Sequence, residues 1–120
     1  MAKKEREISS IDDIPWKKVE GYEKVYEKIL SFDDETGAYT RLLRFDPGAE
    51  IPHILEHDFW EEVFILDGML IDKRKNLTLT KGMYGCRPPG MKHGPYLSPN
   101  GCITFEIRYY GFKGKGKGDG

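Results

Sequence analysis

The fold class is clearest in residues 60–82, which read WEEVFILDGMLIDKRKNLTLTKG. Three short apolar runs alternate here with turn-forming residues. The runs are Val63–Leu66, Met69–Ile71 and Leu77–Thr80. Such runs, separated by glycine and aspartate, are typical of strands joined by tight turns. We therefore predict that Asp67-Gly68 interrupts one strand and that Lys81-Gly82 ends the next.

The same alternation continues on both sides of this stretch. Further strands are predicted at Tyr26–Phe32, Tyr39–Phe45, Met83–Arg87, His93–Tyr96 and Cys102–Tyr110. Asp33–Gly37 favours a tight reversal, so the first two of these strands should form a β-hairpin. No long stretch has a helical period, and the predicted fold is an all-β sandwich or barrel.

The chain of 120 residues is sufficient for one domain with a single core. Residues 22–110 are predicted to form this domain. Residues 1–21 are polar around a few large apolar side chains and should form an N-terminal arm that docks loosely. Residues 111–120 alternate glycine with lysine and should be disordered.

Composition excludes several classes of protein. The charges of the 19 basic and 20 acidic residues nearly cancel, so the chain has no overall electrostatic field that would attract nucleic acid or a membrane surface. The charged N-terminus is not followed by an apolar run, so we expect neither a secretory signal nor a spanning helix, and a cytoplasmic location. Cys86 and Cys102 are too few for a disulfide framework and should be reduced and packed in strands.

Three residues carry the chemistry of this chain. They lie in two glycine-punctuated frames, Gly48-x8-His57-x3-Glu61-x6-Gly68 and Gly82-x5-Pro88-x-Gly90-x2-His93. Two imidazoles and one carboxylate are the ligands of a facial metal triad, which leaves positions open for oxygen or substrate. The sequence therefore predicts a metal site made by His57, Glu61 and His93.

The spacing of these residues requires the backbone to bend. On one straight strand, His57 and Glu61 would be about 13 Å apart, too far for one metal ion. We therefore predict a hairpin turn at residues 58–60. Glu61 should share the inward face with Val63 and Ile65, and the turn before His93 should bring that residue back toward the interior.

The two frames resemble the two motifs of the cupin superfamily, G-x5-HxH-x3,4-E-x6-G and G-x5-PxG-x2-H. Gly82, Pro88, Gly90 and His93 match every fixed position of the second motif. The resemblance covers residues 22–110 and implies a small antiparallel jelly-roll barrel with the metal inside. More loosely, the segments Asp33–Gly48 and Arg87–Tyr96, with Gly101-Cys102, look like the subgroup that includes acetylacetone-cleaving dioxygenases and the cupin domain of zinc-binding anti-sigma factors.

This sequence departs from the first motif at one position. Leu55 stands where the first histidine of HxH is expected. His53 is the nearest substitute and is a candidate fourth ligand if a bulge intervenes. Enzymes of the resembling subgroup usually bind iron through three histidines, so the identity of the metal stays open between Fe(II), which we favour, and Zn, Mn or Ni.

Several aromatic and basic side chains are candidates for the wall of a pocket around the metal. The aromatic candidates are Phe59, Trp60, Tyr84, Tyr96 and Phe105. Ordinary core packing is the alternative for each of them. One of Arg44, Arg87 and Arg108 could face inward and bind a carboxylate or enolate oxygen.

The favoured function is a small-molecule dioxygenase, in which Fe(II) held by the triad acts on an enolisable dicarbonyl or phenolic ketone. The alternatives are a metal- or ligand-sensing module without catalysis, and a Zn- or Mn-dependent isomerase or lyase. An open strand edge and the N-terminal arm also predict a homodimer.

Overall fold

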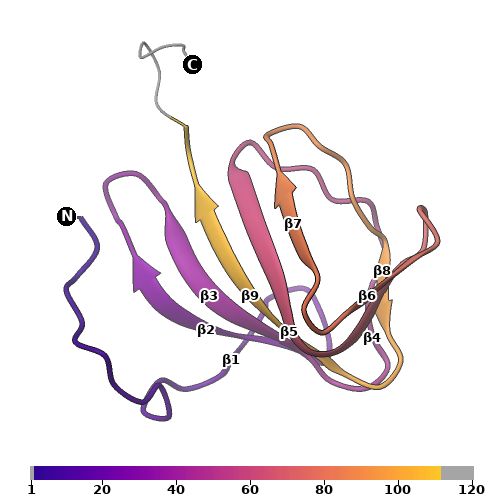
Figure 1. The fold of residues 1–120 in the computed structure, drawn as a ribbon, viewed down its shortest axis with the longest axis horizontal. Helices are drawn as coiled ribbons and strands as arrows, with labels where there is room; N and C mark the ends of the chain where they lie inside the picture. The colour runs from indigo at the N-terminus through magenta and orange to yellow at the C-terminus, as the bar shows by residue number, and fades with distance from the viewer. Residues whose placement is uncertain (1, 112–120) are drawn as a thin grey trace.

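The computed structural model describes residues 2–111, which consist of strands and their connections (Figure 1). Nine strands are present in this range. They are β1 (Lys17–Lys18), β2 (Val25–Phe32), β3 (Tyr39–Phe45), β4 (Ala49–Ile51), β5 (Trp60–Asp72), β6 (Leu77–Thr80), β7 (Tyr84–Arg87), β8 (Tyr96–Ser98) and β9 (Cys102–Tyr109). Within the described residues, no helix is long and apolar enough to cross a membrane.

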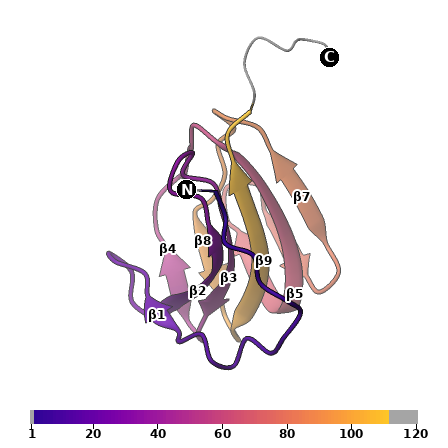
Figure 2. The same cartoon turned by 90° about the vertical axis from the view of Figure 1, so that its left-hand side faces the viewer.

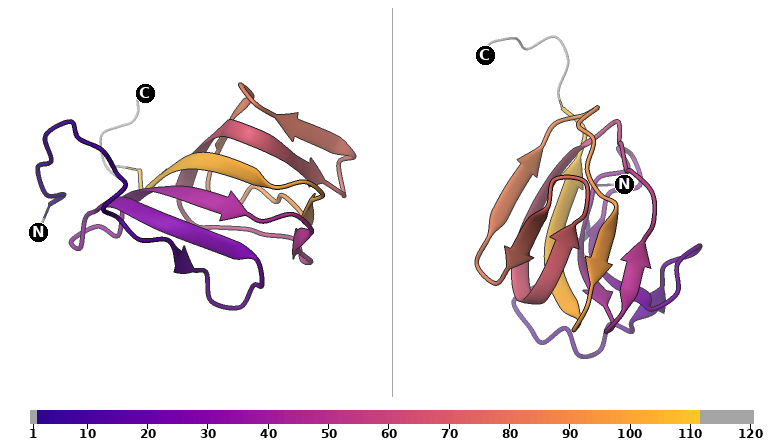
Figure 3. Two further views of the ribbon diagram at one scale, coloured as in Figure 1. Left: turned by 90° about the horizontal axis from the view of Figure 1, so that it is seen from below. Right: turned by 90° about the vertical axis from the view of Figure 1, so that its right-hand side faces the viewer.

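All strand pairs are antiparallel, and the order along the main path is β1-β2-β3-β9-β5-β8-β4. β6 and β7 also pair with β5, at its two ends. The sheet curls into a half-barrel, seen from below and from its right-hand side in Figure 3. The prediction of an all-β, antiparallel jelly-roll is confirmed.

The first predicted hairpin forms as expected. β2 and β3 pair along their length, and the turn is closed by a hydrogen bond of 2.7 Å from Gly37 N to Asp33 O. The Asp33 carboxylate also accepts from Glu35 N at 2.9 Å, which fixes the turn.

β5 differs from the prediction of two strands separated by Asp67-Gly68. It is continuous for 13 residues and only shifts register between Ile65 and Asp67 against β9. Gly68 has φ 78°, and a Cβ there would lie 2.2 Å from Gly101 O. The glycine therefore permits a bulge and a close backbone approach rather than a break.

The connection before β5 also differs from the prediction. Residues 58–59 bend as expected, but β4 pairs with β8 and, among the described strands, not with β5. Residues 52–59 are thus a loop that crosses from one sheet to the other, and not a hairpin turn. The expected strand at His93 begins later, at Tyr96, because Gly94 (φ 79°) and Pro95 interrupt extended pairing.

The core lies inside the curl. Ten buried apolar residues form it: Val25, Leu43, Phe45, Ala49, Ile51, Val63, Ile65, Leu70, Tyr96 and Cys102. Cys102 is buried as predicted, whereas Cys86 lies exposed on β7, and neither forms a disulfide.

The N-terminal arm crosses the outer face of β2 and β3 (Figure 2). The Arg44 guanidinium lies over the Trp16 ring, with Cζ 4.7 Å from the ring centroid. The arm is also attached by β1, which pairs with β2. Ile8, in contrast, is almost fully exposed. Of the tail predicted to be disordered, residues 112–120 lie outside the described part of the chain.

Candidate metal centre

Glu61 lies near the start of β5 and points into the curl. Alternation along the strand buries Glu61, Val63 and Ile65 together, as predicted. The carboxylate is therefore fixed by a strand that pairs with β7 on one side and β9 on the other.

His57 and His93 come from two loops that are joined by backbone hydrogen bonds. Leu55 and His93 exchange both bonds, at 2.7 and 3.0 Å, and Gly90 N donates to His57 O at 2.8 Å. This short bridge brings the loop before β5 against the loop after β7 and places the two imidazoles over the same interior.

The three predicted ligands converge. One ligand atom from each of His57, Glu61 and His93 lies within 4.8 Å of the other two. His93 Nε2 is 3.9 Å from Glu61 Oε1, and the two imidazole centroids are 5.2 Å apart. The Nε2 atoms of both histidines are buried and have no hydrogen-bond partner within residues 2–111. Buried nitrogens without partners are costly, so this pair is well suited to a bound cation or ligand.

Neighbouring side chains orient both rings. His93 Nδ1 is 2.8 Å from Tyr96 Oη, and Arg87 Nη2 donates to the same hydroxyl at 2.9 Å. The His57 ring stacks on Phe59 with 4.6 Å between centroids. A hydrogen bond at the second ring nitrogen is the usual way in which a metal-binding histidine is held.

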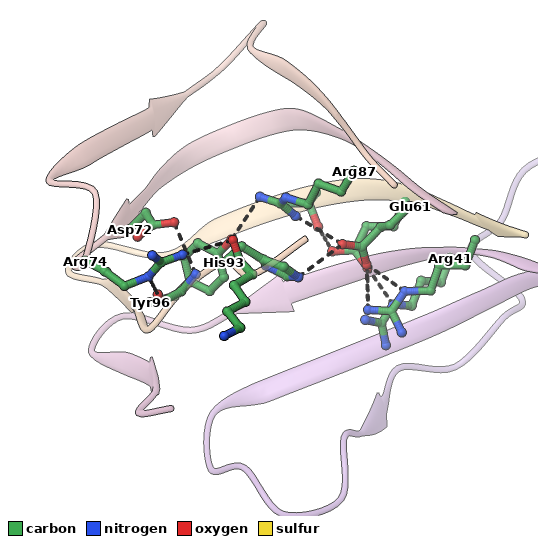
Figure 4. Close-up of polar contacts among 12 residues, drawn as sticks. Arg41, Glu61, Asp72, Arg74, Arg87, His93 and Tyr96 are labelled. Carbon is green, nitrogen blue, oxygen red and sulfur yellow. Dashed lines mark hydrogen bonds and ion pairs between the residues drawn. The ribbon is translucent and has the colours of Figure 1, made fainter. Parts of the chain in front are cut away.

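The loop that carries His93 is anchored separately. Arg74 donates to the carbonyls of Lys92 and Gly94, and Asp72 accepts from Gly94 N at 3.1 Å (Figure 4). Asp72 is buried at the end of β5. The position of His93 is thus fixed from both sides of the loop.

Two guanidinium groups flank the Glu61 carboxylate. Arg87 Nη1 donates to Oε1 at 3.0 Å (Figure 4). Arg108 donates to Oε2 from Nε at 2.7 Å and from Nη2 at 2.6 Å. Each carboxylate oxygen has two lone pairs, so Oε1 keeps one for a further partner, whereas Arg108 occupies both on Oε2. The donor set therefore fits a divalent transition metal, although the two arginines oppose the positive charge of a cation.

Burial keeps both imidazoles neutral. It lowers the pKa of His57, with Arg108 adding to the effect, and it lowers the pKa of His93 to about 3, with Arg87 adding to the effect. Neutral imidazole is the form that binds a metal, so both rings can donate at physiological pH.

The three residues line a cavity of about 180 Å³ inside the curl. Its apolar wall includes Leu43, Ile51, Leu55, Val63 and Leu70. Its charged lining consists of Glu61 and Glu106 with Arg41, Arg87 and Arg108. This mixture suits a small ligand with an apolar body and one anionic group.

One of the five aromatic residues predicted for the pocket, Tyr96, is in the cavity lining. Phe105 alternates with the inward Thr104 and Glu106 and so faces the opposite side of β9. Tyr84 is 59% exposed and donates to Glu62 at 2.6 Å. Phe59 contributes indirectly, through its stacking on His57, and Trp60 lies outside the lining because its parity on β5 is opposite to that of Glu61.

His53 lies outside the group of three. It is exposed, and its Nε2 is 2.8 Å from Tyr22 Oη. The Leu55 side chain instead lines the cavity at the position of the missing histidine.

The basic residues were only partly anticipated. Arg87 and Arg108 face the cavity, whereas Arg44 lies on the outer face against Trp16. Arg41 and Glu106 were missed, and they form a buried ion pair of 2.8 Å. Their alternation with the apolar Leu43 and Cys102 was the signal that could have revealed them.

Comparison with known proteins agrees with this architecture. Residues 4–109 match the family model described as the ChrR Cupin-like domain. No curated protein is a significant sequence match to the chain.

Solved structures share the fold at low sequence identity. An RmlC-like cupin from Shewanella frigidimarina has a TM-score of 0.71 at 20% identity, over 94% of this chain and 97% of that one. An acetylacetone dioxygenase from Acinetobacter johnsonii has 0.72 at 16%, over 90% and 75%. The anti-sigma ChrR of Rhodobacter sphaeroides, solved with SigE, has 0.63 at 22%, over 82% and 51%. With the family model covering almost the entire described chain, the protein belongs to the ChrR cupin-like domain family.

Proposed function

We propose that this protein is a metal-dependent cupin that acts as an Fe(II) dioxygenase on a small enolisable dicarbonyl or phenolic ketone. One observation carries the proposal: two buried, unpartnered imidazole nitrogens converge with a carboxylate inside a small cavity. Two histidines and one carboxylate on one face are the donor set of non-haem Fe(II) oxygenases. The fold shared with an acetylacetone dioxygenase supports the same reading.

Three groups of residues would have different roles around such a metal. His57, Glu61 and His93 would hold the ion, and bound iron would supply the redox chemistry that O2 requires. The aliphatic wall of the cavity excludes water from the reacting groups. Arg87 and Arg108, each paired with Glu61, provide positive charge beside the place where an enolate oxygen would lie.

The proposal is tested by metal content and oxygen consumption. Protein purified without a tag should contain iron near one equivalent per chain. The iron-loaded protein should consume O2 in step with loss of 2,4-pentanedione, and the metal-free and zinc-loaded forms should not. Equal turnover by the metal-free form would refute metal-dependent catalysis, while anaerobic turnover with Zn or Mn would instead identify an isomerase or lyase.

A second candidate, a non-catalytic metal or ligand sensor in the cytoplasm, is favoured by the family match. The matching model is named for ChrR, and the ChrR structure is that of an anti-sigma in complex with SigE. The chain spans about half of that ChrR chain. Stoichiometric capture of a protein partner that depends on bound zinc, with no depletion of any tested dicarbonyl, would favour this candidate over the dioxygenase.

A further inference from the structure

A second hollow lies against the metal cavity, between β6, β7 and the inward face of β5. We refer to it as the β6–β7 groove. It has a volume of about 240 Å³. Its lining includes six aliphatic or thioether side chains, Val63, Ile65, Leu77, Leu79, Met83 and Met91, and is completed on β7 by Tyr84, Gly85, Cys86 and Arg87.

The groove and the metal cavity share part of their walls. Val63, Leu79 and Arg87 line both spaces, so these three side chains separate one space from the other. The Arg87 guanidinium is held on the metal side by Glu61 and Tyr96, which leaves its aliphatic stem for the groove. The wall between the two spaces thus consists of two aliphatic side chains and the stem of Arg87, and a ligand that starts at the two histidines would enter the groove past these groups.

The two spaces differ in chemistry. The metal cavity contains two imidazoles, two carboxylates and three guanidinium groups. The groove has Asp72 and Lys75 at its border, and the Asp72 carboxylate is already bonded to the backbone nitrogens of Lys75 and Gly94. The apolar part of the groove can therefore bind a hydrocarbon chain. Its aliphatic and thioether side chains can adapt to the shape of that chain.

Gly85 leaves the groove open. It pairs with Val63 on β5, so a side chain at this position would point to the same inward face. An added Cβ would meet nothing within 4 Å. The glycine has no positive φ that would require it, and its missing side chain is space available to a ligand.

We propose that the β6–β7 groove binds the unbranched apolar tail of the ligand whose polar head lies at His57 and His93. This inference rests on the proposed function for the head and adds the class of substrate: an amphipathic molecule with an enolisable head and an alkyl chain.

The test is a homologous series of 2,4-alkanediones, titrated calorimetrically into the metal-loaded and the metal-free protein. Each methylene buried in the groove should tighten binding about fourfold, until the groove is filled. Gly85→Leu should flatten this dependence on chain length, and Gly85→Ala should reduce it in part. Thr78→Leu is the control, since it places the same leucine side chain on the opposite face of β6, outside the groove, and should leave the dependence unchanged.

In a plot of binding free energy against the number of methylene groups, the slope tests the groove, and the affinity of the shortest diketone tests the metal site. Failure of the metal or dioxygenase proposal would change the affinity of the shortest diketone or its dependence on metal, and would leave the slope intact. An affinity that does not rise with chain length in either form, or a slope that is the same in wild type and Gly85→Leu, overturns the tail-binding groove.

Discussion

At the scale of single residues, the proposed metal site would depend most directly on His57 and His93. Each offers a buried Nε2 without a partner, so replacing either one by asparagine removes a ligand and keeps a polar group of moderate size. We expect His57→Asn and His93→Asn to weaken zinc or iron binding by more than about 100-fold, because loss of an outer partner alone costs 10–100-fold. Competition titration against a chromophoric chelator measures the effect.

His53→Asn is the matched control for these variants. His53 is exposed and bonded to Tyr22, so this substitution should leave metal affinity within about twofold of wild type. A large loss in His53→Asn would make His53 a fourth ligand and would require the loop between β4 and β5 to rearrange.

Glu106 links stability to pH. Burial alone would raise the pKa of this carboxyl, but Arg41 and Arg108 lower it to about 2 from an ordinary 4.5. The unfolded chain therefore binds a proton at Glu106 at a higher pH than the folded chain does. This stabilisation is complete above about pH 4.5 and should be lost as the pH falls toward 2.

Glu106→Gln should remove this part of the acid response. It leaves Arg41 with one of its two carboxylate partners, and we expect about 3 kcal/mol of destabilisation at pH 7. The loss relative to wild type should shrink as the pH falls from 4.5 to 2, measured by urea unfolding at each pH. A constant difference across this range would show that Glu106 is not ionised in the fold.

At the scale of the elements, Gly68 determines how β5 passes β9. A methyl group there would meet the carbonyl of Gly101 at 2.2 Å, on a residue whose φ is 78°. Gly68→Ala should therefore cost about 3 kcal/mol, from left-handed strain together with a backbone clash. Gly82→Ala has a similar φ of 92° and an open surrounding, and should cost only about 1 kcal/mol. Thermal unfolding of both variants compares the two contributions, and equal losses would contradict a role for the close approach.

Strand positions were largely predictable from the sequence, because burial on one face imposes a period of two. The inward positions of Glu61, Val63 and Ile65 follow from this rule. The rule cannot specify which strands pair, and for that reason a crossing loop was taken for a hairpin at residues 58–60. The strand partner of β4 lies more than 40 residues away in the sequence, and local turn signals do not report on it.

The sequence predicted which three side chains converge at the candidate site, and it predicted the residues that line the cavity less well. Fixed spacing identified His57, Glu61 and His93. The charged wall was missed in part, because buried Arg41 and Glu106 are stable only as a pair whose members are 65 residues apart. Aromatic residues were overestimated as lining, since large side chains also cover the outer face of the sheet.

At the scale of the whole molecule, the outer face of the sheet carries a row of large side chains. Leu42, Phe105, Phe64 and Tyr84 are direct neighbours across β3, β9, β5 and β7. Phe64 is 40% and Tyr84 59% exposed. Extended apolar faces of this kind commonly mark an interface, and we propose that a second copy of the chain covers it.

Light scattering should then give about twice the chain mass of 13.8 kDa. Phe64→Lys should shift the protein to the monomer, because it buries a charge at the centre of the proposed interface. Ile8→Lys, on an almost fully exposed residue of the arm, should leave the mass unchanged. A monomer mass for wild type at millimolar concentration would contradict the dimer.

β5 has a further consequence for access to the interior. The same uninterrupted strand pairs with β7 and β9 in one wall and with β6 and β8 in the other. The two walls therefore cannot move apart at β5 without breaking hydrogen bonds between this strand and its neighbours. For the ligand proposed above, we therefore expect entry and release at the loops on the edge of the cavity, and not by separation of the two walls.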